Sequence, residues 1–203
     1  MRDRDLVRLY WPVELRPAFD ALFAIDDAMA DIVASSTQAA LGAIRLAWWR
    51  DALVRLDSGS PPPEPRLQAA VAELLVQGVT GQDLAALEEG WAHLLDEDAD
   101  TEAALVRGER LFAMGAKLLR TPNANVAEAG RLFARADYAR RGLAPLGACQ
   151  PITATFERRL RPLTCLAALA ARDMRQGGSP FEPEATPGRA ARLLSHKLFG
   201  GLS

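Results

Sequence analysis

Apolar residues recur every three or four positions along most of the chain, which is the spacing of one face of an α-helix. The first stripe lies within residues 15–33 and comprises Leu15, Phe19, Leu22, Phe23, Asp26, Ala30 and Val33. The second stripe lies within residues 39–56 and comprises Leu41, Ile44, Trp48 and Ala52. Apolar–polar alternation of the length of a strand is not found. The pattern therefore predicts an all-α protein, and we expect residues 1–203 to form a single domain.

Capping residues and prolines indicate where the helices begin and end. Ser36 or Thr37 is expected to cap the second helix, and Thr80 with Asp83 resembles a capping box. The prolines of the segment 57–65 interrupt the helical pattern, because consecutive prolines cannot continue a helix. Further helices are expected over residues 67–77, 84–95, 102–119, 126–141, 154–176 and 189–199, with the acidic run 96–100 as a solvated loop.

Two adjacent tryptophans lie within the second helix. Trp48 belongs to the apolar stripe, which assigns it to the core. Trp49 then points about 100° away around the helix. Since neighbouring positions cannot both face one core, one of the two is expected to meet another helix, a membrane surface or a partner.

Composition narrows the function classes. The chain has a net charge of −2, which gives no reason to expect nucleic acid as a partner. Cys149 and Cys165 form no CxxC motif, so a reduced, cytoplasmic setting is expected. The first residues carry charges where a signal peptide needs an apolar segment. No apolar run is long enough to span a bilayer.

Several kinds of active site lack their sequence signatures here. His93 and His196 each stand alone in a predicted helix, which disfavours a zinc site. GxSxG, a Walker loop and a strand followed by GxGxxG are also missing. We assign His93 to packing and expect His196 to face solvent.

Acidic residues in the first helix are the main candidates for chemistry. Asp26 lies on the apolar stripe, and a buried carboxylate needs an arginine, a hydroxyl group or the rim of a cavity. Asp27 and Asp31 lie one turn apart and could together bind a hard cation such as Mg²⁺. They could equally form an ordinary solvent-exposed face, which their spacing alone favours.

The N-terminal third also resembles the squalene/phytoene synthase family. The segments that carry the resemblance are "RPAFDALFAIDDAMADIV" and "LGAIRLAWWRDAL". The matching residues are Arg16, Phe19, Leu22, Phe23, Ala24, Trp49, Arg50 and Leu53. The tail from Arg161 to Leu198 looks like the last helix and C-terminal segment of bacterial members. "IRLAWWRDAL", the strongest part, looks closest to the branch of complex I assembly factors.

The resemblance implies an isoprenoid-synthase-type helical bundle with a central cavity. Active members join two prenyl diphosphates head to head, with Mg²⁺ held by two facing Asp-rich helices that stabilise the leaving diphosphate. This chain departs from that pattern. Asp27 and Asp31 are displaced by three residues from the first motif. In the second motif only Asp137 is found, and Arg140 and Arg141 replace the paired acids.

Three functions therefore remain open. The first is a non-catalytic, isoprenoid-synthase-like protein that binds a lipid or prenyl ligand or acts as an assembly factor, and we lean towards it. The second is an active Mg²⁺-dependent prenyl diphosphate transferase of terpenoid biosynthesis. The third is a helical protein-interaction module without a ligand, which an exposed tryptophan and a filled interior would favour. No cofactor is certain, and Mg²⁺ is expected only if the protein is active.

The active alternative names particular residues. Asp27 and Asp31 would hold Mg²⁺, with Asp137 or Asp173 opposite. Two arginines of the second helix, Arg45 and Arg50, would bind the diphosphate. The candidates for lining the cavity are Phe19, Phe23, Asp26 and Trp48.

The C-terminal segment mixes cations and apolar residues. These are Arg189, Arg192, Leu193, Leu194, Lys197, Leu198 and Phe199. Such a helix could rest on an anionic membrane. A helix that closes the core would look the same, and we favour that interpretation. We therefore expect a cytoplasmic protein with at most peripheral contact at the inner membrane.

Overall fold

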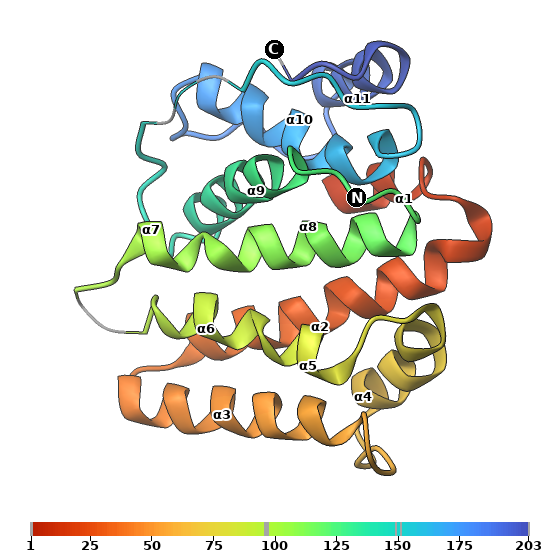
Figure 1. The fold of residues 1–203 in the computed structure, drawn as a ribbon. Helices are drawn as coiled ribbons and strands as arrows, with labels where there is room; N and C mark the ends of the chain where they lie inside the picture. Colours follow the sequence, from red (N-terminus) through yellow and green to blue (C-terminus); the bar gives the residue numbers. More distant parts are fainter. Residues whose placement is uncertain (1, 96–97, 149, 151, 203) are drawn as a thin grey trace.

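Helices stacked in successive layers make up the computed structural model, which describes residues 2–95, 98–148, 150 and 152–202 (Figure 1). The longer helices are α2 (Arg16–Ser35), α3 (Ala39–Arg55), α8 (Val106–Leu118), α9 (Val126–Arg140), α10 (Arg161–Arg175) and α11 (Pro187–Phe199). The short ones are α1 (Asp3–Arg8), α4 (Pro65–Ala69), α5 (Gly81–Ala85), α6 (Leu87–Ala92) and α7 (Thr101–Ala104). The described residues contain no strand, so the all-α prediction is confirmed.

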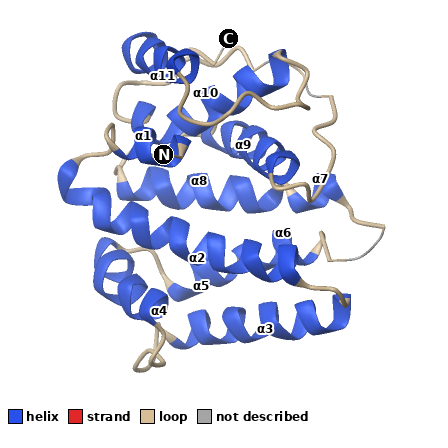
Figure 2. Ribbon diagram, turned by 180° about the vertical axis from the view of Figure 1, so that it is seen from behind, coloured by secondary structure: helices blue, strands red, loops and turns tan. Residues whose placement is uncertain are grey.

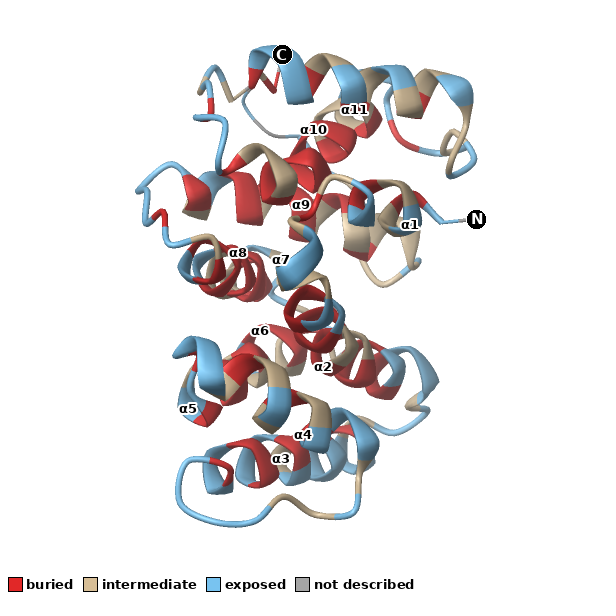
Figure 3. Ribbon diagram, turned by 90° about the vertical axis from the view of Figure 1, so that its right-hand side faces the viewer, coloured by how far each residue is buried: buried red, intermediate tan, exposed pale blue. Residues whose placement is uncertain are grey.

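The layers follow one another from α3 at one end to α11 at the other (Figures 1 and 2). Next to α3 lie α5 and α6, then α2, then α8, and α9 and α10 follow before α11. Buried residues of all these layers form one connected core that runs from Val7 to Leu202. Figure 3 shows these buried positions on the sides of the helices that face one another.

Helix α2 crosses the centre of the stack and is buried along most of its length. Its apolar stripe packs as the sequence predicts, with Phe19 and Phe23 almost completely inaccessible. Trp11 precedes the helix and stacks on both rings, at centroid distances of 4.8 Å from Phe19 and 5.6 Å from Phe23. Stacked rings of this kind stabilise the core beyond the area that they bury.

Helices α8 and α9 approach each other closely. This approach depends on Gly108 and Gly130, which face each other. A Cβ atom on Gly108 would lie 2.0 Å from the carbonyl oxygen of Gly130, and the reverse distance is 2.1 Å. The two backbones are therefore in contact, and only glycine fits at either position.

Two predicted helix boundaries are wrong. Residues 154–160 are not helical, and α10 begins at Arg161, which places Pro162 in its first turn. Proline is tolerated there because the first N–H groups of a helix have no partner within it. The cap of α3 is Gln38, without a side-chain bond, and neither Ser36 nor Thr37. The capping box at Thr80 and Asp83 is confirmed.

The predicted core face of α3 is also wrong. Trp49 is buried, whereas Trp48 is 45% exposed and Leu41 and Ile44 are more exposed still. The helix carries a second apolar stripe through Leu46 and Leu53, and this stripe faces the core. Because both stripes have helical spacing, the periodicity could not decide between them. Trp48 is therefore not a cavity-lining residue of the interior.

No helix in the described part of the chain is both long enough and apolar enough to cross a bilayer.

Candidate functional site

Asp26 is a completely buried carboxylate at the centre of α2. The guanidinium of Arg107 in α8 binds it in a two-point arrangement, with Nε 2.7 Å from Oδ1 and Nη2 2.5 Å from Oδ2. The indole Nε1 of Trp91 donates to Oδ1 at 3.0 Å. The same indole ring lies under the guanidinium, 4.0 Å from its carbon. Of the three surroundings that the sequence allows for a buried Asp26, the structure thus has the arginine partner, which is Arg107.

Asp137 of α9 lies on the other side of Arg107. Its Oδ2 is 2.8 Å from Nη2 of Arg107, and its Oδ1 accepts from Nε of Arg141 at 3.0 Å. Burial disfavours the charged form, yet these two guanidinium groups hold the pKa of Asp137 below its ordinary value. Despite its burial, Arg107 has a pKa raised above its ordinary value by Asp26 and Asp137. Both groups are therefore ionised.

Asp27 completes the cluster. Arg4 of α1 binds both its oxygens, and Nη2 of Arg141 donates to Oδ1 at 2.8 Å. Burial opposes ionisation of this carboxyl too, but the two arginines lower its pKa. Arg141 thus connects Asp27 on α2 with Asp137 on α9.

We call Asp26, Asp27, Asp137, Arg4, Arg107 and Arg141 the central cluster. Its carboxylates come from two helices and converge, but the groups between them are guanidinium ions. Three positive charges balance three negative ones. Among the described residues, no group of three or more acidic, histidine or cysteine side chains is arranged to hold a metal ion.

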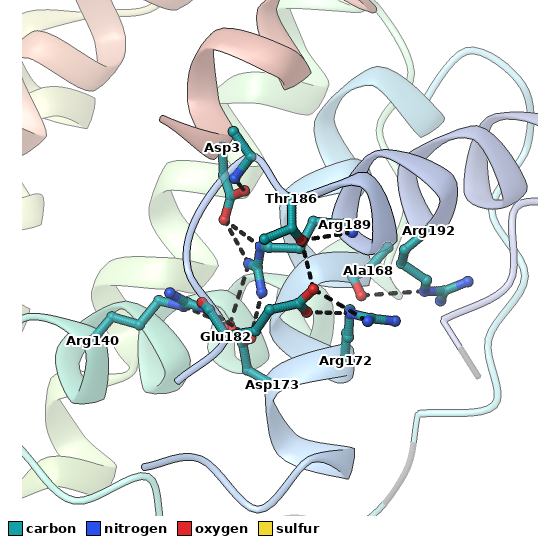
Figure 4. A network of polar contacts seen from close by, with 10 residues as sticks. Asp3, Arg140, Ala168, Arg172, Asp173, Glu182, Thr186, Arg189 and Arg192 are labelled. Carbon is teal, nitrogen blue, oxygen red and sulfur yellow. Dashed lines mark hydrogen bonds and ion pairs between the residues drawn. The ribbon is translucent and has the colours of Figure 1, made fainter. Parts of the chain in front are cut away.

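A second polar network adjoins the central cluster and is drawn in Figure 4. Asp173 of α10 accepts from Arg140 at 2.7 Å and from Arg189 at 2.5 Å. Arg189 also donates to Asp3 at 2.7 Å. Arg172 pairs with Glu182 at 2.6 Å at the edge of the network. This network joins α1, α9, α10 and α11.

The hollow between the two networks is small. Its volume is about 80 Å³, and its walls include Arg4, Phe133, Asp137, Asp173 and Arg189. Pockets for small organic ligands are usually about 300–1,000 Å³ and mostly apolar. This hollow is therefore too small and too polar for a prenyl chain.

The other diphosphate and metal candidates lie elsewhere. Asp31 is exposed and borders a surface hollow of about 360 Å³ with Arg45 and Trp48. Arg45 donates to the hydroxyl of Ser35, 3.3 Å away. Exposed Arg50 lies 3.1 Å from Asp51. None of the three is part of the central cluster.

Phe19 and Phe23 pack in the core. Arg4 lies over the Phe23 ring at 4.6 Å, so this ring borders the central cluster. His93 is half-buried, as a packing residue would be. The prediction that His196 faces solvent is wrong, because its side chain is completely buried. Cys149 lies outside the described residues.

Arg107 is the most important residue that the sequence analysis missed. It lies on the buried stripe of α8 with Leu111, Met114 and Leu118. An arginine on such a stripe signals a buried partner as clearly as Asp26 does. What the sequence could not provide was the pairing of the two, because 81 positions separate them.

Comparison of the chain with protein-family models, with curated proteins and with solved structures finds no match.

Proposed function

We propose that this chain is a non-catalytic helical protein of isoprenoid-synthase type that acts by binding a partner, as an assembly factor does. The observation that carries the proposal is the central cluster, in which arginines take the positions between facing carboxylates. A Mg²⁺-dependent transferase needs those carboxylates free to bind metal.

The arginines that replace the second acidic motif support this proposal. Arg141 binds Asp27 and Asp137, and Arg140 binds Asp173. Each is therefore the counterion of an acid that the active alternative would assign to metal. The size and polarity of the hollow between the networks also favour binding at the surface of the protein over binding of a prenyl group inside it.

Substitution of Arg141 tests whether its guanidinium group occupies the place of a metal ion. We expect Arg141→Met to lower the melting temperature, because Asp27 and Asp137 then share too little positive charge. Addition of ~10 mM Mg²⁺ should raise the melting temperature of this variant by a few degrees, as binding to the folded state does. The wild type should be unaffected by Mg²⁺ at equal ionic strength. The measurement is differential scanning calorimetry.

Arg8→Met is the matched control, because Arg8 pairs with Asp20 at the surface. It should show no response to Mg²⁺. In parallel, wild-type protein is incubated with farnesyl or geranylgeranyl diphosphate and Mg²⁺. A head-to-head product, or stabilisation of the wild type by Mg²⁺, would overturn the proposal in favour of the active transferase.

The surface of α3 favours a role in binding another protein. Leu41, Ile44 and Trp48 form an exposed apolar stripe along its outer side. Burial of such a stripe against a partner would stabilise a complex, and exposed tryptophan is enriched at binding sites.

Photo-crosslinking in cells tests this role. A benzophenone side chain in place of Ile44 should give a discrete cross-linked species, which a second change, Trp48→Glu, should abolish. The control places the same group at Val76, which is 70% exposed on another surface. The same cross-linked species from both positions would reject the role of α3.

A further inference from the structure

Cations without a carboxylate partner gather near the end of α11 and the start of α10. More than half of the arginines pair with an acid, as Arg107, Arg140 and Arg189 do. Among the described residues, five cations of this region have no carboxylate within 4 Å: Arg120, Arg158, Arg159, Arg161 and Lys197. The chain as a whole is slightly acidic, so this local excess is distinctive.

Two adjoining surface hollows bring these cations together. The first has a volume of about 480 Å³ and is lined by Tyr10, Arg158, Arg161, Pro162, Cys165, Lys197 and Leu198. The second, of about 580 Å³, shares Arg158 and Pro162 with it and adds Arg120 and Arg159. Among the described residues that line either hollow, Glu14 is the only acid. Glu157 is the other exposed acid close by in the sequence.

Hydrogen bonds hold part of this basic region in place. Arg161 donates to the carbonyl oxygens of Phe156, Lys197 and Leu198 at 2.8–3.0 Å, and so caps the last turn of α11. The ammonium group of Lys197 lies 4.8 Å above the ring of Tyr10. Arg158 and Arg159 are exposed. Their guanidinium groups are therefore available to an anionic partner.

Large apolar side chains flank the same hollows. Leu198 lines the first hollow and is 59% exposed, and the adjacent Phe199 is 72% exposed. Leu194 is exposed one turn earlier. The opposite side of α11 is buried through Leu193 and His196. The helix thus closes the core with one side and presents an apolar edge beside the cations with the other.

We infer that this surface, which we call the basic face, binds the headgroup region of a bilayer that contains anionic phospholipids. Phosphate groups complement the unpaired cations, and leucine and phenylalanine can enter the boundary of the acyl chains. Long arginine and lysine side chains suit a position at the boundary between headgroups and acyl chains, since their charged ends can reach back to the headgroups. A soluble anion would match the charges but would leave Leu198 and Phe199 exposed. The hollows of the basic face share no residue with the central cluster, and the inference does not depend on the proposed function.

Vesicle co-sedimentation of the full chain tests the inference. We expect binding to vesicles of phosphatidylcholine with about a third of phosphatidylglycerol, and little binding to phosphatidylcholine alone. Binding should weaken at high salt, because screening reduces attraction between exposed charges. Arg158→Gln with Arg159→Gln should weaken binding ~10-fold or more. Leu198→Ser with Phe199→Ser should also weaken it by at least about fivefold.

The matched control is Arg45→Gln with Arg55→Gln, which removes two exposed arginines from α3. This control should bind as the wild type does, and all variants should keep the wild-type melting temperature. Equal loss in the control would show non-specific attraction and overturn the inference. So would equal binding to both kinds of vesicle, or binding to neither. Unchanged binding to the vesicles after the Leu198 and Phe199 substitutions would also overturn the inference, because it would show attraction to surface charge without contact with the acyl chains.

Discussion

At the scale of single residues, the most unusual feature of this protein is a set of charged side chains in its interior. Asp26 and Arg107 are both completely buried and bind each other at two points. A pair of this kind adds little net stability, but loss of one partner typically costs about 3–5 kcal/mol because the other charge stays buried. We expect that such a pair disfavours arrangements of α2 and α8 in which either charge would be buried alone.

His196 gives a prediction about pH. Its Nδ1 lies 2.9 Å from the carbonyl oxygen of Gly201, which can only accept, so Nδ1 carries the proton. Its Nε2 lies 2.8 Å from the Thr164 hydroxyl and accepts from it. Burial, with help from the nearby charges of Arg192 and Arg161, lowers the pKa of His196 from 6.5 to about 4.

On acidification, the neutral imidazole of His196 therefore takes up a second proton at a higher pH in the unfolded chain than in the folded protein. The contribution of His196 to the free energy of unfolding is complete above pH 6.5 and is lost as the pH falls towards 4. Its full size is about 3 kcal/mol. Urea unfolding at several pH values measures it. His196→Gln should flatten the curve between pH 6.5 and 4. A wild-type stability that is constant over this range would contradict the assignment.

At the scale of helices, the contact of α8 with α9 depends on two glycines. Gly108→Ala or Gly130→Ala would place a methyl group about 2 Å from a backbone oxygen. Since the clash is with backbone on both sides, the helices must move apart, and we expect a loss of roughly 2–3 kcal/mol in unfolding free energy.

Chemical denaturation of the alanine variants checks this, with Gly59→Ala as the control. A Cβ atom on Gly59 would lie 3.6 Å from its nearest neighbour, so its effect should be within about 0.5 kcal/mol. A loss as small as this in the Gly108 variant would mean that α8 and α9 do not touch as described.

Helices also show how far the sequence could predict the fold. The period of α2, the start of α10 beside Pro162 and the cap at Thr80 all follow from local chemistry, even though we misplaced the second of these. The orientation of α3 does not follow, because it carries two apolar stripes of helical spacing and only the partners of Leu46 and Trp49 decide between them. Pairings such as Asp26 with Arg107, or Asp27 with Arg141, depend on the order of the layers. The candidate site was therefore predicted as a set of acids, but not as a set of ion pairs.

At the scale of the whole molecule, two surfaces of the stack carry different chemistry. The outer side of α3 carries the exposed apolar stripe of Leu41, Ile44 and Trp48. The basic face extends from the end of α11 past the start of α10 to the end of α8, and it carries unpaired cations beside leucine and phenylalanine. The two surfaces share no residue, so a partner bound at α3 would leave the basic face free for an anionic surface.

The bond between Asp3 and Arg189 spans 186 positions of the chain. During synthesis, α1 is made long before its counterion, because Arg189 is translated 186 residues after Asp3. Until Arg189 is available, the Asp3 carboxylate lacks the guanidinium that it binds in the folded protein, and the docking of α1 against α11 is incomplete. The layers formed by α2, α6 and α8 can therefore fold before the step that joins α1 to α11.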